Sequence, residues 1–269
     1  MKAAESLDLQ KIRSQLNPDL LDGRDDLVIF DCIDSTNAWA LSQCQLATHM
    51  PMACFAEQQL NGRGRKNRVW YSPPAQNIYL SLLREFDIQA DQLYGLSMVV
   101  GICIVRVLND LGVHAGLKWP NDVYVGSGKI AGILIETRIK PGASVCAVIG
   151  VGLNYDMTDA SKVNIETHWT DLLKELGNDH QVDRSLVAGK MLNEIMAGCD
   201  LFAESGFDRF RDEWKRYDLC VGKTLDIIED GGVVQGQYLG VNENCALMAQ
   251  IDGCQKIFYA ADVSIRMKE

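Results

Sequence analysis

The stretch from Gln59 to Leu83, QLNGRGRKNRVWYSPPAQNIYLSLL, places four cationic side chains within six positions of a chain whose formal net charge is −10. The four are Arg63, Arg65, Lys66 and Arg68. Two glycines alternate with the first of them, and because glycine reaches positive φ, the backbone can direct consecutive N–H groups at one anion. After Pro73-Pro74, the segment Asn77–Leu83 is mostly apolar, as in a strand that enters a core. The stretch therefore predicts an anion-binding loop between two strands, with phosphate as the expected ligand.

A second stretch, Lys118–Glu136, reads KWPNDVYVGSGKIAGILIE and has a strand, turn, strand pattern. An Arg/Lys run alone is also typical of a solvated hairpin or a nucleic-acid patch, and the second stretch makes both alternatives weaker. Its GSGK segment is not a Walker A loop, because Val123 and Ile130 stand where that motif needs glycine and Ser or Thr. It predicts instead a hairpin turn that places Lys129 at the start of a buried strand. The alternative is that Lys129 is an ordinary surface residue, as lysines at such positions often are.

Together the two stretches resemble the biotin–protein ligases. The family pattern GRGR…R-x-W-x-S-P…N-x-Y-x-S, KWPND and K-x-x-G-I-L is present in the same order and spacing. It is carried by Gly62–Arg65, Arg68, Trp70, Ser72-Pro73, Asn77, Tyr79, Ser81, Lys118–Asp122 and Lys129–Leu134, with extensions at Asp34–Asn37 and Ile149–Asn154. Asn67 and Ala75 stand where many members have glycine, and asparagine tolerates the left-handed region better than most residues.

The resemblance implies a two-domain α/β (α+β) fold. Residues 1–219 are expected to form a catalytic domain that binds biotin and ATP, with the mixed sheet and helices of class II aminoacyl-tRNA synthetases and biotin ligases. Independently of the family, five short β segments follow Lys223, which predicts a small barrel. In the family this is an SH3-like β-barrel, here residues 220–269, that contributes to ATP and acceptor engagement. The alternative, if the resemblance is set aside, is a domain that only packs against the first one and takes no part in the chemistry.

The resemblance also implies a two-step reaction. Biotin and ATP, with Mg²⁺ held mainly by the ATP phosphates, give biotinyl-5′-AMP, and biotin then passes to a lysine of a carrier protein. The expected partner is the biotin carboxyl carrier protein of acetyl-CoA carboxylase or of a related carboxylase. Two alternatives remain open: a lipoate–protein ligase-like enzyme, which shares the fold and a catalytic lysine but not the GRGR and KWPND motifs, and a non-catalytic biotin-responsive binding protein.

For biotin, the resemblance assigns seven positions: Ser35, Thr36, Asn37, Gln59, Gly62, Arg63 and Gly132. Paired hydroxyls suit the ureido ring of biotin because each hydroxyl both donates and accepts hydrogen bonds. From the sequence alone, Ser35 or Thr36 is better explained as the N-cap of a helix that contains Ala38–Leu41.

For ATP and the adenylate, the resemblance assigns eight positions: Arg63, Arg65, Arg68, Trp70, Asn121, Lys129, Leu153 and Asn154. Lys129 and Arg65 are the expected catalytic cations, and Asp122 is the candidate to orient the acceptor lysine or take its proton. Leu153 and Asn154 are expected to face the base; the alternative is a central strand, Val145–Asn154, whose glycines only permit close packing. Trp70 is expected to pack on the ligand, or else in the core.

Composition sets the remaining bounds. The chain has 269 residues, 47% hydrophobic and 23% charged, as in a globular protein of one or two domains. The nine cysteines are an odd number without a C-x-x-C pair, which predicts reduced thiols and a cytoplasmic location. The four histidines are dispersed as well, so we expect no metal site held by the protein. No apolar run approaches the roughly 20 residues of a membrane span. Only about thirty residues precede the first predicted strand, whereas a DNA-binding helical module needs about 60, so we expect the short form that does not bind DNA. Monomer and homodimer are both open.

Overall fold

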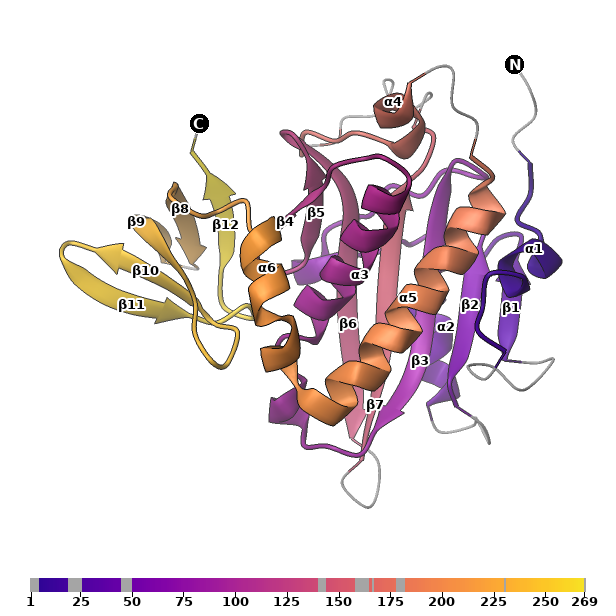
Figure 1. The fold of residues 1–269 in the computed structure, drawn as a ribbon, viewed down its shortest axis with the longest axis horizontal. Coiled ribbons are helices and arrows are strands. Elements are labelled where there is room, and N and C mark those ends of the chain that lie inside the picture. The colour runs from indigo at the N-terminus through magenta and orange to yellow at the C-terminus, as the bar shows by residue number, and fades with distance from the viewer. Residues whose placement is uncertain are drawn as a thin grey trace.

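The computed structural model describes residues 5–18, 26–44, 50–139, 144–157, 165, 167–177, 182–229 and 231–268. A seven-stranded mixed sheet has the strand order β1-β2-β3-β7-β6-β5-β4 (Figure 1). Its strands are β1 (Leu27–Phe30), β2 (Met52–Ala56), β3 (Asn77–Phe86), β4 (Gly116–Lys118), β5 (Asp122–Val125), β6 (Gly128–Ile139) and β7 (Val145–Asn154). Only β1 and β2 pair in parallel; the other neighbours are antiparallel. This is the mixed α/β sheet that the sequence predicted.

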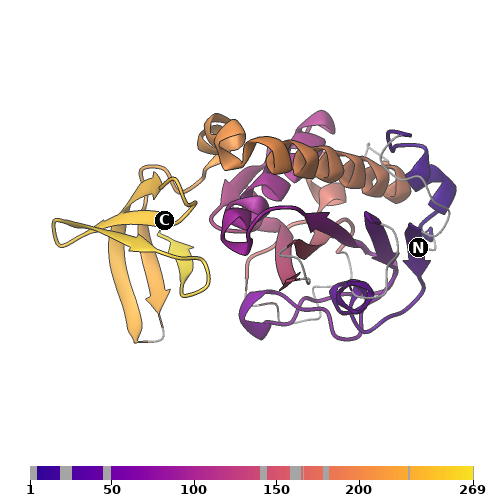
Figure 2. The ribbon, with the colours of Figure 1, turned by 90° about the horizontal axis from the view of Figure 1, so that it is seen from below.

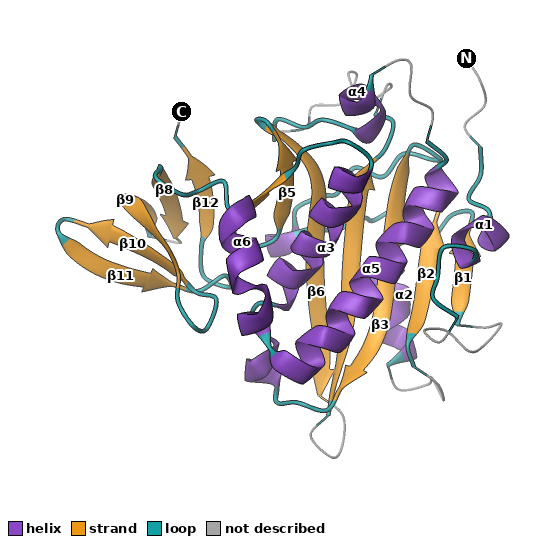
Figure 3. Ribbon diagram, in the orientation of Figure 1, coloured by secondary structure: helices purple, strands orange, loops and turns teal. Residues whose placement is uncertain are grey.

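Helices cover both faces of this sheet. They are α1 (Leu9–Arg13), α2 (Thr36–Gln43), α3 (Leu96–Asp110), α4 (Leu172–Leu176), α5 (Arg184–Ser205) and α6 (Arg211–Tyr217). The long helices α3 and α5 pack side by side over one face (Figure 3), and α2 lies against β2, β3 and β7 on the opposite face (Figure 2). Among the described residues, no helix combines the length and apolarity that a membrane crossing needs.

The central strand β7 shows how the two faces differ. Ala147, Ile149, Val151 and Leu153 belong to the main core with α3 and α5. The alternate residues Cys146 and Val148 pack with Ala40 and Cys44 of the α2 side. Because side chains in a strand alternate between faces, the next residues on the α2 side are Gly150, Gly152 and Asn154. That face is left open for a cavity.

A second sheet follows the helices. Its five antiparallel strands have the order β11-β10-β9-β8-β12. They are β8 (Thr224–Glu229), β9 (Gly232–Val241), β10 (Leu247–Ile251), β11 (Cys254–Phe258) and β12 (Ser264–Met267), one for each predicted β segment. The change from helices to short strands agrees with a separate C-terminal module, and the division at residue 219/220 stays a prediction.

A glycine separates α3 from a short turn that precedes it. A 3₁₀ turn covers Ala90–Leu93, and α3 begins at Leu96. Gly95 separates the two with φ of 90°, and a Cβ there would lie 2.6 Å from Sγ of Cys245, which stands between β9 and β10. Glycine is therefore required where the start of α3 meets the C-terminal region.

Candidate active site

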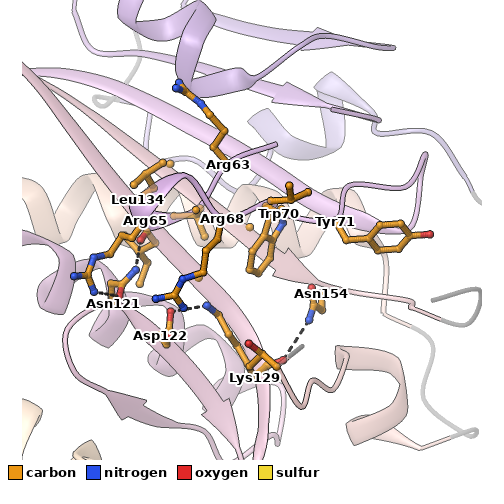
Figure 4. A pocket seen from close by; sticks show the side chains of 18 of the residues that line it. Arg63, Arg65, Arg68, Trp70, Tyr71, Asn121, Asp122, Lys129, Leu134 and Asn154 are labelled. Atoms are coloured by element: carbon orange, nitrogen blue, oxygen red, sulfur yellow. Dashed lines mark hydrogen bonds and ion pairs between the residues drawn. The ribbon is translucent and has the colours of Figure 1, made fainter. Parts of the chain in front are cut away.

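A cavity of about 520 Å³ opens on the α2 side of the large sheet. Figure 4 shows side chains that line it. It is lined by all of the predicted site residues except Gly62 and Leu153. Those that line it are Ser35, Thr36, Asn37, Gln59, Arg63, Arg65, Arg68, Trp70, Asn121, Asp122, Lys129, Gly132 and Asn154. Residues separated by more than a hundred positions in sequence therefore meet around one space.

One end of the cavity is a connected network of hydroxyl and amide groups. Ser35 caps α2, because its hydroxyl accepts a hydrogen bond from the amide of Ala38 at 3.4 Å. The Thr36 amide and hydroxyl both donate to Gln59 Oε1, at 2.9 and 3.1 Å. Ser81 Oγ lies 2.8 Å from Thr36 Oγ1 and 2.6 Å from Asn37 Oδ1. The cap and the binding interpretation of Ser35 are thus compatible, since the capping residue also lines the cavity.

Two glycines of β7 form the floor between the two ends. A Cβ at Gly150 would lie 2.1 Å from Asn37 Oδ1, and a Cβ at Gly152 would lie 2.5 Å from the Trp70 ring. Neither contact is tolerable, so glycine is required for Asn37 and Trp70 to approach the sheet. Trp70 is half-buried and lies on this floor inside the cavity. Its indole is thus placed to contact a ligand, which favours the first of the two interpretations of this residue.

The other end of the cavity carries a lysine–carboxylate pair. Lys129 Nζ donates to Asp122 Oδ1 at 2.6 Å, and both side chains are about one-fifth exposed. The Lys129 Nζ also lies 5.3 Å from the centroid of the Trp70 ring. As predicted, a tight turn joins β5 to β6 and places Lys129 near the start of β6. A negative partner for Lys129 was not anticipated: Asp122 had been assigned only to the acceptor lysine.

The glycine-rich loop is docked on the second sheet's region. Arg65 Nη1 donates to Asn121 Oδ1 at 3.1 Å, and its Nη2 donates to the carbonyl oxygens of Ala260 and Val263. Lys66 Nζ donates to the Asp262 carbonyl at 3.1 Å. Arg68 donates to Ser264 Oγ at 2.8 Å. Burial lowers the pKa of the Arg65 guanidinium from its ordinary value. Mutual repulsion among the cations is therefore offset by oxygens that come from about 195 residues further along the chain.

The two positions where many family members have glycine both have a positive φ in this chain. Asn67 and Ala75 each have φ of 56°, and the neighbouring Lys66 has φ of 53°. Asparagine tolerates this left-handed region, and a single alanine there costs about 1–2 kcal/mol. The loop thus keeps the curled path that the motif requires, in spite of the two substitutions.

Two predicted residues lie elsewhere. Leu153 was expected to face the nucleotide base, but its side chain is fully buried in the main core on the α3 and α5 side; strand alternation gives the cavity face to Asn154. Gly62 is buried beneath the loop, where a Cβ would lie 2.5 Å from Ser72 Oγ. Arg63 does line the cavity, yet its guanidinium extends away from the other cations toward Glu136, with Nη2 3.7 Å from Oε1 (Figure 4).

Several lining residues had not been assigned a role. Gly150 and Gly152 could have been found from period-two alternation, because they share a face of β7 with Asn154. Trp169 lines the cavity from a segment bridged to Lys129, and no local pattern indicates this long-range contact. Lys118, in the KWPND motif, also lines it. Among the described residues, no group of three or more His, Cys, Asp and Glu side chains is placed to hold a metal ion.

Comparison with known proteins identifies the class. The profile of the Biotin/lipoate A/B protein ligase family matches residues 29–154. Over 264 residues the chain is 33% identical to the bifunctional ligase/repressor BirA of Salmonella typhimurium, covering 98% of this chain and 79% of that protein. The chain belongs to this ligase family.

Within the family, the chain is similar to biotin ligases. The biotin–[acetyl-CoA-carboxylase] ligase of Paracoccus denitrificans is 37% identical over 238 residues, covering 86% of this chain and 96% of that protein. The biotin protein ligase of Aquifex aeolicus, solved in complex with biotin and ATP, superposes with a TM-score of 0.74 at 24% identity, covering 90% of this chain and 99% of that one. At that identity the structural match establishes the fold.

Proposed function

We propose that this chain is a biotin–protein ligase, which activates biotin with ATP to biotinyl-5′-AMP and transfers it to a lysine of a carrier protein. The observation that carries the proposal is that one cavity joins a hydroxyl and amide network to a cationic end, with Trp70 between them. A ureido ring needs donors and acceptors together, which Thr36, Asn37 and Gln59 supply. The phosphates need positive charge, which Lys129, Arg65 and Arg68 supply.

In the first step the biotin carboxylate attacks the α-phosphate of ATP. A carboxyl group with a pKa of about 4 is ionised at neutral pH, so this nucleophile needs no base. It needs protection from the repulsion of a second anion. Lys129 and Arg65 provide this by electrostatic stabilisation, and they hold the phosphate in line with the attacking oxygen.

Mg²⁺ fits this site as a companion of the phosphates. Mg²⁺ is commonly held by substrate phosphates with few protein ligands, and the cavity's carboxylate Asp122 is already paired with Lys129, so the ion would be held mainly by the ATP phosphates. When bound, the ion supplies neutralising charge to the phosphate oxygens. The protein's own residues do the rest: they bind biotin, orient the phosphate and exclude water.

In the second step the acceptor lysine attacks the mixed anhydride. Its amine has a pKa of about 10.4 and is mostly protonated at pH 7, so it must lose a proton. Asp122 is the proposed residue that orients the amine or takes that proton. Its pairing with Lys129 at 2.6 Å supports this role, because Lys129 is the cation expected at the α-phosphate, where the anhydride is formed.

The two alternatives are less favoured. A lipoate ligase lacks the GRGR and KWPND motifs, and two relatives that match 85% and 86% of this chain are named biotin–[acetyl-CoA-carboxylase] ligase. A non-catalytic binding protein was favoured only if Asn67 and Ala75 spoiled the loop, and both residues retain positive φ. The expected acceptor is the biotin carboxyl carrier protein of acetyl-CoA carboxylase or a related carboxylase. The cytoplasmic location and the choice between monomer and homodimer stay predictions.

The direct test is adenylation by the purified chain. We expect ATP–pyrophosphate exchange that depends on biotin and is not supported by lipoate, followed by transfer of radiolabelled biotin to a carrier domain of acetyl-CoA carboxylase. The same carrier with its acceptor lysine changed to arginine is the matched control. Exchange with lipoate in place of biotin, or binding of biotin without any exchange, would contradict the proposal.

The glycine-rich loop should become more protected when the adenylate forms. Four like charges and two glycines leave residues 62–69 little intrinsic order, and three of the cations already donate to oxygens of residues 260–264, two to carbonyls and one to the Ser264 hydroxyl. We therefore expect amide hydrogen exchange to slow in residues 62–69 and in residues 260–264 together when biotin and ATP are added, because a closed loop protects the anhydride from water. Equal exchange with and without ligands, or slowing confined to the C-terminal strands, would count against this closure.

A further inference from the structure

Lys118 is a cation of the cavity wall for which the reaction described above has no use. It ends β4, the edge strand of the large sheet, and pairs in register with Asp122 of β5. Its side chain lines the same cavity as Lys129 and Arg68. It directly precedes Trp119, which is fully buried and donates a hydrogen bond from its indole to the Cys245 carbonyl at 2.9 Å. The backbone that presents Lys118 is therefore firmly held.

The other cations of the cavity each have a protein oxygen as partner. Arg63 has Glu136, Arg65 has Asn121 and two carbonyls, Arg68 has Ser264, and Lys129 has Asp122. Among the described residues, the Lys118 ammonium has no hydrogen-bond or ion-pair partner; it lies 5.3 Å from the ring centroid of Tyr124. Burial lowers the pKa of Lys118 from its ordinary value, against the opposing effect of Asp122. A half-buried cation without an acceptor is costly, and an anionic ligand would remove that cost.

The position of Lys118 along the sheet indicates which anion it binds. The hydroxyl and amide network lies over β3 and β7, the Lys129–Asp122 pair over β6 and β5, and Lys118 beyond it on β4. In phosphoryl transfer the attacking and leaving oxygens lie roughly in line on opposite sides of the phosphorus. A carboxylate that enters from the β3 and β7 side therefore expels its leaving group toward β4.

We propose that the Lys118 ammonium binds the β- and γ-phosphates of ATP and stabilises the departing pyrophosphate. The inference rests on the proposed function. A carboxylate oxygen of biotin forms a bond to the α-phosphorus, the bond from that phosphorus to the bridging oxygen breaks, and its electron pair leaves on pyrophosphate. Lys118 donates hydrogen bonds to this growing charge and transfers no proton. Its role ends when pyrophosphate leaves, so the transfer of biotin to the carrier does not need it.

The first test measures binding of inorganic pyrophosphate with Mg²⁺ to the ligand-free protein by calorimetry. Loss of one charge-assisted hydrogen-bonding group weakens binding by about 10-fold or more, so Lys118→Met should raise the Kd by at least that factor. Lys118→Arg, which keeps the charge, should stay within about threefold of wild type. Lys190→Met on the exposed face of α5 is the matched control and should change nothing. An unchanged Kd in Lys118→Met overturns the proposal.

The second test separates the two half-reactions with chemically synthesised biotinyl-AMP. In the reverse reaction, which regenerates ATP, Lys118→Met should raise the KM for pyrophosphate by about 10-fold. Transfer from the same adenylate to the carrier should stay within about twofold of the wild-type rate. Equal losses in both half-reactions would indicate a structural role and overturn the assignment. If Lys118→Met does not fold, Lys118→Gln takes its place in both tests. A wild-type protein that makes no adenylate would refute the proposed function, while the calorimetric test of Lys118 would still stand.

Discussion

Replacing Lys129 with alanine is expected to lower the rate of biotin-dependent adenylation by about 10²–10³-fold, which is typical for loss of one preorganised electrostatic group. The reason is that Lys129 lies at the cationic end of the cavity, within hydrogen-bonding distance of Asp122 and above the Trp70 ring. The change removes a charge that is directed at the α-phosphate and little apolar contact. ATP–pyrophosphate exchange with biotin measures the effect, and a Lys129→Ala protein that exchanges at the wild-type rate would refute the role given to Lys129.

Asp122→Asn is the informative companion of that variant. It removes the partner of Lys129 but keeps the size of the side chain, so the lysine remains available to the phosphate. We expect exchange to survive better in Asp122→Asn than in Lys129→Ala, and transfer to the carrier to be the more affected step. Thermal unfolding of both variants separates loss of chemistry from loss of fold. If the two variants lose exchange equally, the ion pair itself and not the Lys129 charge is what the first step requires.

The motifs predicted the turn and the strands around the cavity because these features are local. The order GRGR, KWPND and K-x-x-G-I-L placed Lys129 on a strand after a tight turn, and β7 runs over the predicted Val145–Asn154. Apolar runs bounded by glycine and asparagine are sufficient to predict such strands. The five C-terminal strands were predicted for the same reason: short β segments are separated by residues that favour turns.

What the sequence could not report is which face a strand shows and which distant segments meet. Leu153 and Asn154 are adjacent in the motif, but only knowledge that α2 lies on one face and α3 on the other decides that Asn154 lines the cavity. The contact of Arg65 with Ala260 joins residues 195 positions apart, and no local pattern encodes it. Gly95 likewise has no room for a side chain because of Cys245, which stands far along the chain between β9 and β10.

A buried ion pair anchors both ends of the glycine-rich loop. Arg184, the first residue of α5, donates to Glu57 Oε2 at 2.5 Å, to the Asn77 carbonyl at 3.0 Å and to the Glu5 carbonyl at 2.7 Å. Both charged residues are less than one-tenth exposed. Glu57 also accepts a hydrogen bond from the Leu7 amide. Because Glu57 precedes the loop and Asn77 follows it, one guanidinium holds the loop's two ends and the N-terminal segment together.

Arg184→Met is therefore expected to destabilise the protein by about 3–5 kcal/mol, the cost of leaving a buried charge without its partner. Urea unfolding monitored by tryptophan fluorescence measures the free energy of unfolding. The double variant Arg184→Met/Glu57→Gln should recover part of the loss, because it removes the orphaned carboxylate that makes the single variant costly. Lys215→Met, which removes an exposed pair with Asp212 at 3.6 Å, is the control and should change the free energy of unfolding by no more than about 0.5 kcal/mol.

The same variant links stability to the site. With its anchor gone, the loop should lose protection from amide exchange in residues 57–77 before the rest of the large sheet does, since local opening follows the least-supported segment. Biotin-dependent exchange of pyrophosphate should then fall even at temperatures where Arg184→Met is still folded, because the loop cations are no longer held over the phosphate. A folded Arg184→Met protein with wild-type loop protection would mean that the contacts of Arg65, Lys66 and Arg68 with residues 260–264 hold the loop by themselves.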